Sequence, residues 1–449
     1  MPILEAAQLV SPTLGQVLEF GQGMTTAATT SELPVVIIGA GMAGLACACY
    51  LHRAGRLVLV LEAADAVGGR VRTDVTAEGF RLDRGFQVLQ TKYPEVQHLI
   101  DYGALQLQTF RSGAVIRLPN GQQTTLVNPL QQPTAAFSAL TSRVGTLPDK
   151  LRIASLAQHV RGFTSGQLLS RNSTNQLDTA TFLRQYGWSE QIIDNFFRPF
   201  FGGVYLDRSL STAANFFEFV FKHFVEGEVA IPALGMQQIP EQLAARLPQG
   251  SIRLNTPVSA IRELEVELTT GEILAAATVV VATDGTTAAH LLPPASEPLP
   301  PQWRQTTCTY FAAPAPAARP DKLLRLNAAP DALAHNVAFS SDVSSAYAPA
   351  GQQLVSVSTH GEHGLSEEEL TARLRQELAA WFGPAASQWQ HLRTYVIPQA
   401  LPVYAAGQPA RQPLKLHDTL YRCGDHTAYP SLNAAIASGR EVAEAILSA

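Results

Sequence analysis

The sequence predicts an α/β protein whose first ordered unit contains a parallel sheet. Three observations predict it: an apolar β-branched run, Val35-Val36-Ile37-Ile38; glycines directly after this run; and a helical segment leading to a second strand that ends on an acid. Such runs are typical of strands buried on both faces of a parallel sheet. The chain therefore opens with a βαβ unit near residue 34.

The glycine segment reads Gly39-Ala40-Gly41-Met42-Ala43-Gly44 and precedes an Ala- and Leu-rich helix over 45–53. Its glycines are spaced for a tight turn, for close approach of the backbone to a pyrophosphate, and for packing of the helix on the strand. The free N–H groups and positive dipole of the helix N-terminus favour phosphate there. We expect Gly39, Gly41, Met42, Ala43 and Gly44 to contact the cofactor.

The second predicted strand, 57–61, ends on Glu62, about 20 residues beyond the glycines. A carboxylate at this position accepts hydrogen bonds from a ribose 2′-hydroxyl and repels a 2′-phosphate, which disfavours NADP. The next segment contains Gly68-Gly69-Arg70. Its glycines allow the backbone to approach phosphates, and Arg70 supplies a planar cation.

These residues resemble the flavin-containing amine oxidase superfamily, which includes monoamine oxidases, protoporphyrinogen oxidases and phytoene desaturases. The resemblance implies a Rossmann-like FAD-binding domain of the glutathione-reductase type, with Gly69 and Arg70 on the pyrophosphate. It disfavours an NAD-dependent dehydrogenase. It implies activity as an FAD-dependent oxidoreductase.

The resemblance recurs in two later segments. A short strand ends on Gly424-Asp425, and Asn433-Ala434 open the C-terminal helix. In the family the Asp holds the ribityl chain and the helix N-terminus faces the flavin, so all four residues are assigned to FAD, and Val258 is assigned to its adenine end. No cysteine stands at the family's covalent attachment position, which implies noncovalent FAD.

Three pocket candidates adjoin flavin-proximal motifs: Phe86, His426 and Tyr429. Phe86 and Arg84 replace residues that are usually apolar and small in the family. Phe86 would narrow the site, whereas Arg84 is expected to be an exposed structural residue. The catalytic residues themselves are left unassigned, because the cofactor carries the difficult chemistry.

The predicted domains are interleaved along the chain. Residues 1–33 read as a poorly ordered tail, with Met24 as an alternative start of translation. The FAD-binding domain comprises 34–90, 230–294 and 401–449. Residues 91–229 and 295–400 form an α+β substrate domain.

Nine of the 19 Phe lie between positions 196 and 224. Our first interpretation of these residues is that they form the core of the domain. The second is that they line an apolar pocket for a polyene or tetrapyrrole-like substrate. An amine substrate is the alternative within the superfamily. A different class, a flavoprotein with structural FAD acting as a pathway binding partner, stays open as well.

Composition excludes several functions. The formal charge is −5 with no dense basic block, which argues against nucleic-acid binding. The segment His360-Gly361-Glu362-His363 lacks the helical histidine spacing of a zinc protease, so no metal is predicted. The four scattered cysteines indicate reduced thiols in a cytoplasmic protein. No apolar run of about 18 residues occurs, which excludes a spanning helix; peripheral membrane contact, the electron acceptor and the oligomeric state are left open.

Overall fold

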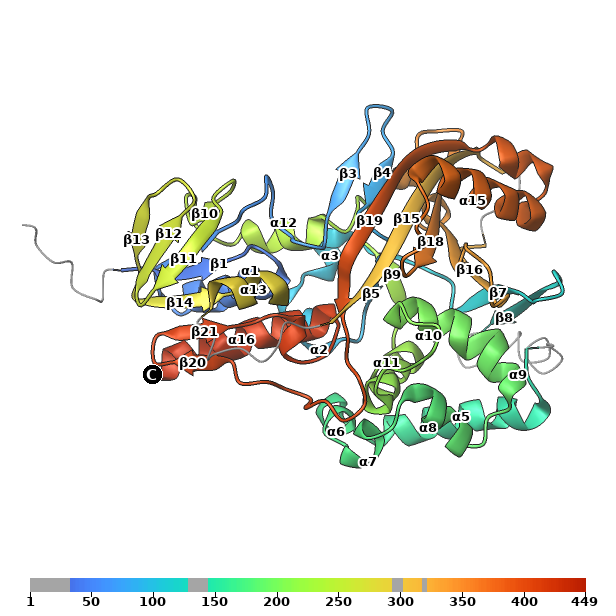
Figure 1. Cartoon of the computed structure of the whole chain (residues 1–449), viewed down its shortest axis with the longest axis horizontal. Coiled ribbons are helices and arrows are strands. Elements are labelled where there is room, and N and C mark those ends of the chain that lie inside the picture. The colour runs from blue at the N-terminus through green and yellow to red at the C-terminus, as the bar shows by residue number, and fades with distance from the viewer. Residues whose placement is uncertain (1–32, 128–143, 293–301, 317–320) are drawn as a thin grey trace, which may run out of the picture.

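The computed structural model describes residues 33–127, 144–292, 302–316 and 321–449. The tail predicted over 1–33, including Met24, lies outside the described residues except for its last position. Within the described ranges the chain forms an α/β protein, as predicted. Figure 1 shows the part predicted to bind a nucleotide at the left, a second large sheet at the upper right and a group of helices below that sheet.

The predicted nucleotide-binding part is built on a six-stranded sheet in the order β10-β2-β1-β14-β21-β20, parallel except for β20. β1 is buried along its whole length, which explains its unbroken apolar sequence. Three distant parts of the chain supply the strands. They are β1 (Val35–Ile38), β2 (Val58–Leu61), β10 (Ile252–Arg253), β14 (Thr278–Val281), β20 (Lys415–His417) and β21 (Leu420–Arg422).

Alternate residues of β1 enter separate hydrophobic clusters on the two faces of this sheet. Val35 and Ile37 pack with α1 (Met42–Arg53) and α16 (Leu432–Ser448). Val36 and Ile38 pack with a three-stranded sheet and a short helix. These elements are β11 (Val258–Arg262), β12 (Glu265–Leu268), β13 (Ile273–Ala275) and α13 (Gly285–Leu291).

The second large sheet has the order β19-β15-β18-β17-β16-β7-β8 and is antiparallel except for the β16–β7 pair. The helix α15 (Glu367–Phe382) covers one face, where Leu370, Leu374 and Leu378 pack on Phe311 and Val355. The strands are β7 (Gly113–Arg117), β8 (Gln123–Val127), β15 (Trp303–Pro314), β16 (Leu324–Asn327), β17 (Asn336–Phe339), β18 (Gln352–His360) and β19 (Gln390–Pro402).

Helices supply the third part of the molecule, beneath this sheet (Figure 1). Its central helix, α11 (Ala214–Glu226), is buried over ten of its residues, including the charged Glu218 and Lys222. The others are α5 (Leu147–Arg161), α6 (Ser165–Leu169), α7 (Asn172–Asn175), α8 (Thr179–Gln185), α9 (Glu190–Ile192), a π-helical turn (Ile193–Phe197) and α10 (Arg198–Tyr205).

Short elements connect the three parts. The hairpin of β3 (Thr73–Val75) and β4 (Arg81–Asp83) reaches from the nucleotide-binding part to the second sheet. The remaining elements are β5 (Leu89–Gln90), β6 (Gln108–Thr109), β9 (Val229–Ile231), α2 (Pro94–Leu99), α3 (Tyr102–Leu105), α12 (Gln238–Ala244), α14 (Ser340–Val343) and 3-10 turns at Ser345–Tyr347, Pro384–Gln388 and Asp425–Thr427.

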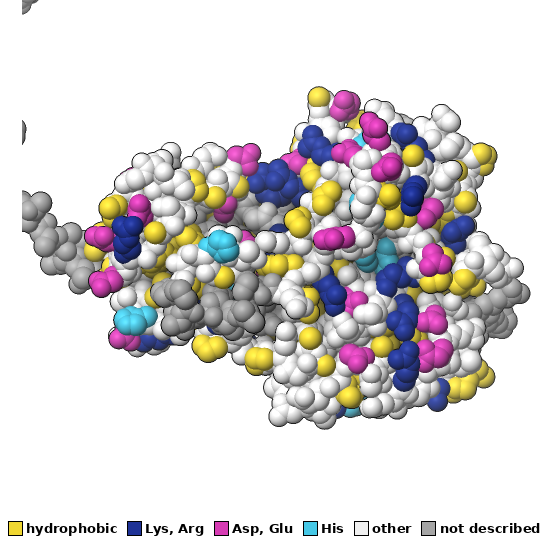
Figure 2. All heavy atoms as spheres, viewed as in Figure 1, with side chains coloured by type: hydrophobic (Ala, Val, Ile, Leu, Met, Phe, Trp, Pro, Cys, Tyr) yellow, Lys and Arg dark blue, Asp and Glu magenta, His cyan; other side chains and the backbone are white. Residues whose placement is uncertain are grey.

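The surface carries mixed charge. Figure 2 shows basic and acidic side chains interspersed over the face in view, without one sign dominating. None of the helices in the described ranges has both the length and the apolar character needed to cross a bilayer.

Candidate functional site

The glycine turn after β1 is shaped by steric limits at two of its three glycines. Gly39 has a φ of +107°, and a Cβ on Gly44 would lie 2.0 Å from the Gly39 carbonyl oxygen. At Gly41 the backbone is extended, and a Cβ would meet nothing within 4 Å. Gly41 caps α1 without any side-chain hydrogen bond, and no acid stands in the first turn, where Met42 and Ala43 lie. The turn therefore leaves space and unneutralised N–H groups for an anionic group.

Glu62 stands at the end of β2, as predicted, and holds the glycine turn in place. Its carboxylate accepts hydrogen bonds from the N–H groups of Ala40 at 2.7 Å and Ala64 at 2.9 Å. The carbonyl of Glu62 accepts from Thr256, two positions before Val258, so these predicted residues lie near one another. A carboxylate has about four acceptor positions, so two bonds leave capacity for ribose hydroxyls.

Arg70 and Asp425 come together from opposite ends of the chain. The guanidinium donates to both carboxylate oxygens, at 3.0 and 2.6 Å, and to the carbonyl of Ala400 at 3.0 Å. Gly68, just before Gly69, forms an isolated bridge with Gly41, which brings this turn beside the glycine turn. The predicted pyrophosphate and ribityl contacts thus share one location.

We expect Arg70→Lys to weaken FAD binding about 10- to 100-fold. Lysine cannot reproduce the forked pairing with Asp425, and a hydrogen bond to a charged group contributes roughly 1.5–3 kcal/mol. The Kd for FAD, measured by reconstitution of the deflavinated protein, checks this. Arg253→Lys is the matched control, because Arg253 forms a similar forked pair with Glu272 on the surface. Equal losses in both variants would contradict the assignment.

His426 packs on Gly424, beside this pair. A Cβ on Gly424 would lie 2.5 Å from the imidazole ring, so glycine is required there. Within the described part of the chain, both ring nitrogens of His426 are buried without a hydrogen-bond partner. Burial lowers the pKa of His426 to about 4, although the Asp425 carboxylate acts to raise it. A neutral imidazole with unused nitrogens suits contact with a bound polar group.

Asn433 and Ala434 lie in the first turn of α16, as predicted, but both make bonds within the protein. Ser431 caps the helix by accepting from the Ala434 N–H at 3.0 Å. The Asn433 side chain accepts from the Glu95 N–H and donates to the hydroxyl of Tyr429. Tyr429 is itself buried against two phenyl rings of α11, which links this helix end to the helical part.

Arg84 and Phe86 occupy the turn after β4. Gly85 there has a φ of +103°, and its Cβ position lies 2.8 Å from a methyl group of Ile397 on β19. Phe86 is half-buried, with its ring edge against Phe110 at 6.1 Å. Gln87 donates to the carbonyls of Arg70 and Arg84, so it fixes this turn to the predicted pyrophosphate site. We did not expect this role for Gln87.

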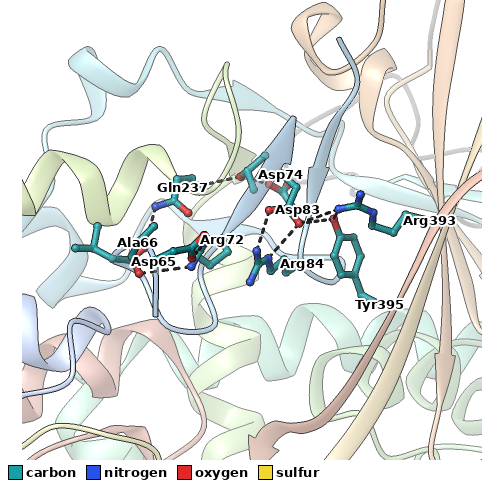
Figure 3. Close-up of polar contacts among 11 residues, drawn as sticks. Asp65, Ala66, Arg72, Asp74, Asp83, Arg84, Gln237, Arg393 and Tyr395 are labelled. Carbon is teal, nitrogen blue, oxygen red and sulfur yellow. Dashed lines mark hydrogen bonds and ion pairs between the residues drawn. The ribbon is translucent and has the colours of Figure 1, made fainter. Parts of the chain in front are cut away.

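Arg84 is exposed by about two fifths, as expected of a structural residue, but it is anchored (Figure 3). It donates two hydrogen bonds to Asp74, which also accepts from Tyr395 at 2.7 Å and pairs with Arg393 at 3.4 Å. Burial acts to raise the pKa of Asp74, but the bonds from Arg84 and Tyr395 outweigh it and lower that pKa. The cluster joins the β3–β4 hairpin to β19.

Asp83, directly before this turn, is a second connection that the sequence did not reveal. It is 4% exposed, and its carboxylate accepts from the Thr73 hydroxyl, the Met236 N–H and the Tyr347 hydroxyl at 2.5, 3.0 and 2.9 Å. Its carbonyl accepts from the hydroxyl of Tyr310. Burial raises its pKa to about 6, even though these bonds act to lower it.

The phenylalanine cluster divides into two groups. Six rings are buried in the core, as the first interpretation predicted: Phe197, Phe201, Phe216, Phe217, Phe219 and Phe221. Phe196, Phe200 and Phe224 are only half-buried. They contact one another, with ring centroids 5.4 Å apart for Phe196 and Phe200 and 4.9 Å for Phe200 and Phe224. Partly exposed phenyl rings at one place form an apolar surface.

Among the described residues, the structure shows neither a group of side chains that could hold a metal ion nor an exposed thiol. In the described residues no set of three or more His, Cys, Asp or Glu could hold a metal ion. All four cysteines are free and buried, and burial raises the pKa of Cys49, Cys308 and Cys423.

Three comparisons place this geometry among known proteins. A family model described as flavin-containing amine oxidoreductase matches residues 42–447. Putrescine oxidase of Kocuria rosea is 31% identical over 250 residues, 52% of this chain and half of the relative's length. Protoporphyrinogen oxidase 2 of Arabidopsis thaliana is 30% identical over 175 residues, 38% of this chain and 32% of the relative.

A solved structure of putrescine oxidase bound to putrescine superposes with a TM-score of 0.70 at 20% identity, covering 93% of this chain and 99% of that chain. This likeness shows a common fold. The open space at Gly41, the free acceptor capacity of Glu62 and the unpartnered nitrogens of His426 all fit an FAD molecule along these residues.

Proposed function

The chain belongs to the flavin-containing amine oxidoreductase family, and from this premise we propose that it removes a hydride equivalent from a C–C or C–N single bond of an apolar small molecule. Membership makes it an oxidoreductase with a flavin cofactor. We further propose that FAD is held noncovalently by the residues around Gly41, Glu62, Arg70 and Asp425.

When bound, FAD accepts the hydride equivalent, so no acid–base pair in the protein is required for that step. The protein residues contribute position and shielding from water. Gln87 fixes the turn that carries Phe86 against the Arg70 segment, and the Asp83 carbonyl fixes it to Tyr310 of the second sheet. Arg70 and Asp425 hold the cofactor end of the site.

The apolar substrate is supported by the half-buried rings of Phe196, Phe200 and Phe224. An aromatic pair for an amine is less well supported, because the hydroxyls of Tyr404 and Tyr429 are bonded to asparagines and both rings are buried. The second candidate is still an amine oxidase, which the similarity to putrescine oxidase favours. A candidate of another class is a flavoprotein whose FAD is structural and which acts as a binding partner in a pathway.

The test is anaerobic addition of a polyene, a porphyrinogen and putrescine in turn to the purified holoprotein, followed by its visible absorption. Bleaching of the flavin by the polyene or the porphyrinogen is the expected result. Bleaching by putrescine alone would replace the proposal with the amine oxidase. A flavin that none of them bleaches would favour the structural role.

We expect Phe200→Ala to lower kcat/KM for an apolar substrate about tenfold. Losing apolar contact of this kind removes roughly 1–3 kcal/mol of discrimination. Phe382→Ala is the control, because Phe382 is also half-buried among aromatic rings, but on the opposite face of the second sheet. A loss of equal size in the control would attribute the effect to general destabilisation.

A further inference from the structure

Buried polar atoms without partners gather at one end of β16, β17 and β18. Among the residues that the structure describes, they belong to four neighbouring side chains: Asn327 Nδ2, His335 Nε2, Asn336 Oδ1 and both ring nitrogens of His360. His335 is 2% and Asn336 4% exposed. An unsatisfied buried donor or acceptor costs roughly 1–3 kcal/mol, so a group of five calls for an explanation.

These atoms converge on one location. The rings of His335 and His360 stack with centroids 3.9 Å apart. A Cβ on Gly203 of α10 would lie 3.4 Å from His335 Nε2 and 3.3 Å from Asn336 Nδ2. The helix therefore presents a glycine, without any polar side chain, to this cluster.

The cluster lies on the face of the second sheet that meets the predicted flavin side. Thr306 on β15 pairs directly with both His360 and Ile397, so the three side chains share one face. Ile397 contacts the turn at Gly85. His360 is two strand spacings from Ile397, roughly 10 Å. The opposite face is covered by α15.

Two charged side chains near the cluster, Arg208 and Asp207, are each held by several hydrogen bonds. Arg208 donates to the carbonyls of Asn327 and Ala329 and to His335 Nδ1, and has no ion pair among the described residues. Because arginine only donates, the proton of His335 is on Nε2. Asp207 accepts five bonds, from Ser209, Ser211 and Arg304. Burial lowers the pKa of His360 to about 3 and that of His335 well below its ordinary value, so both rings are neutral.

We propose that His360 and Asn336 form a polar subsite for a neutral hydroxyl group of the substrate, about 10 Å from the flavin-side turn. The inference rests on the proposed function, because it names the substrate class as an apolar molecule with a hydroxyl. The hydroxyl accepts from an imidazole N–H and donates to Asn336 Oδ1. An ammonium group of a substrate would face the cationic Arg208, with no free carboxylate nearby to pair with it. A carboxylate of a substrate would have no proton to donate to Asn336 Oδ1.

The test uses the holoprotein and four probes that share a nine-carbon chain: nonan-1-ol, 1-methoxynonane, nonylamine and nonanoate. Binding is read from the change in flavin absorption. We expect the alcohol to bind about tenfold more tightly than the ether and more tightly than both charged probes. Asn336→Leu removes the acceptor of the hydroxyl proton, so it should abolish the preference without changing the Kd of the ether. His360→Phe keeps the stacked ring and removes both nitrogens, so it should weaken the binding of the alcohol and of the ether, because both oxygens accept from the imidazole.

His363→Phe is the control, because His363 lies three positions away on the opposite face and bonds to Thr307. It should keep the preference. An alcohol that binds no better than the ether, tightest binding of nonylamine or nonanoate, an unchanged preference in Asn336→Leu, or unchanged binding of the alcohol in His360→Phe would overturn the subsite. If a polyene bleaches the flavin while the preference is missing, the proposed function survives without it. If the preference is present and lost in Asn336→Leu, but nothing bleaches the flavin, the subsite stands and the proposed reaction falls.

Discussion

Gly41→Val is expected to abolish flavin binding and to leave the fold intact. The extended backbone at Gly41 accepts any residue, and its Cβ position is open, so the protein alone offers no obstacle to the substitution. The same space is where the backbone must approach the pyrophosphate. We expect the affinity for FAD to fall more than about 100-fold, which corresponds to roughly 3 kcal/mol.

The ratio of flavin to protein absorbance and the far-ultraviolet circular dichroism of the purified variant provide the measurement. Gly44→Val is the contrasting variant, since its Cβ would overlap the Gly39 carbonyl and force α1 away from β1. It should lose both flavin and stability. A Gly41→Val protein that retains stoichiometric flavin would contradict the assignment of the cofactor to this turn.

Asp83→Asn is expected to change how stability depends on pH. The pKa of Asp83 rises from 3.8 to about 6 on folding, so the folded protein binds this proton more tightly than the unfolded chain. The resulting stabilisation is complete below about pH 4 and is lost as the pH rises through 6. The shift corresponds to about 3 kcal/mol. The variant, which cannot ionise, should therefore gain about this much relative to the unsubstituted protein between pH 4 and 7.

Denaturant unfolding at several pH values measures this difference. Asp207→Asn is the control, because Asp207 is also buried but its pKa is lowered: burial acts to raise it, and bonds from Ser209 and Ser211 outweigh burial. The change in the free energy of unfolding caused by Asp207→Asn should therefore be constant above pH 4. A constant difference for Asp83→Asn over the same range would mean that the Asp83 carboxyl does not hold its proton in the folded protein.

The parts of the site that could be predicted are those encoded by neighbouring residues. The strand before Gly39, the glycine spacing and the acid at Glu62 form one local pattern, and each stands where predicted. The family resemblance assigned Arg70 and Asp425 to one cofactor, but the ion pair between them was not predicted. Local patterns carry no information on such a distance, because 355 positions separate the two residues.

The same limit explains what was missed. Asp83 looks like any carboxylate at a strand end, and its partner Tyr347 is 264 positions away. The segment around His360 was interpreted only for metal binding, because the orphaned nitrogens depend on β17 and α10 packing against it. Burial of a polar atom is a tertiary property, so periodicity and composition do not report it.

The order of strands in the nucleotide-binding sheet has a consequence for synthesis of the protein. β1 can pair with β2 soon after both are synthesised, but its other neighbour, β14, follows more than 200 residues later. Translation proceeds at about 5–20 residues per second, so one edge of β1 stays unpaired for tens of seconds. During that interval this edge can pair with other chains, so aggregation competes with folding.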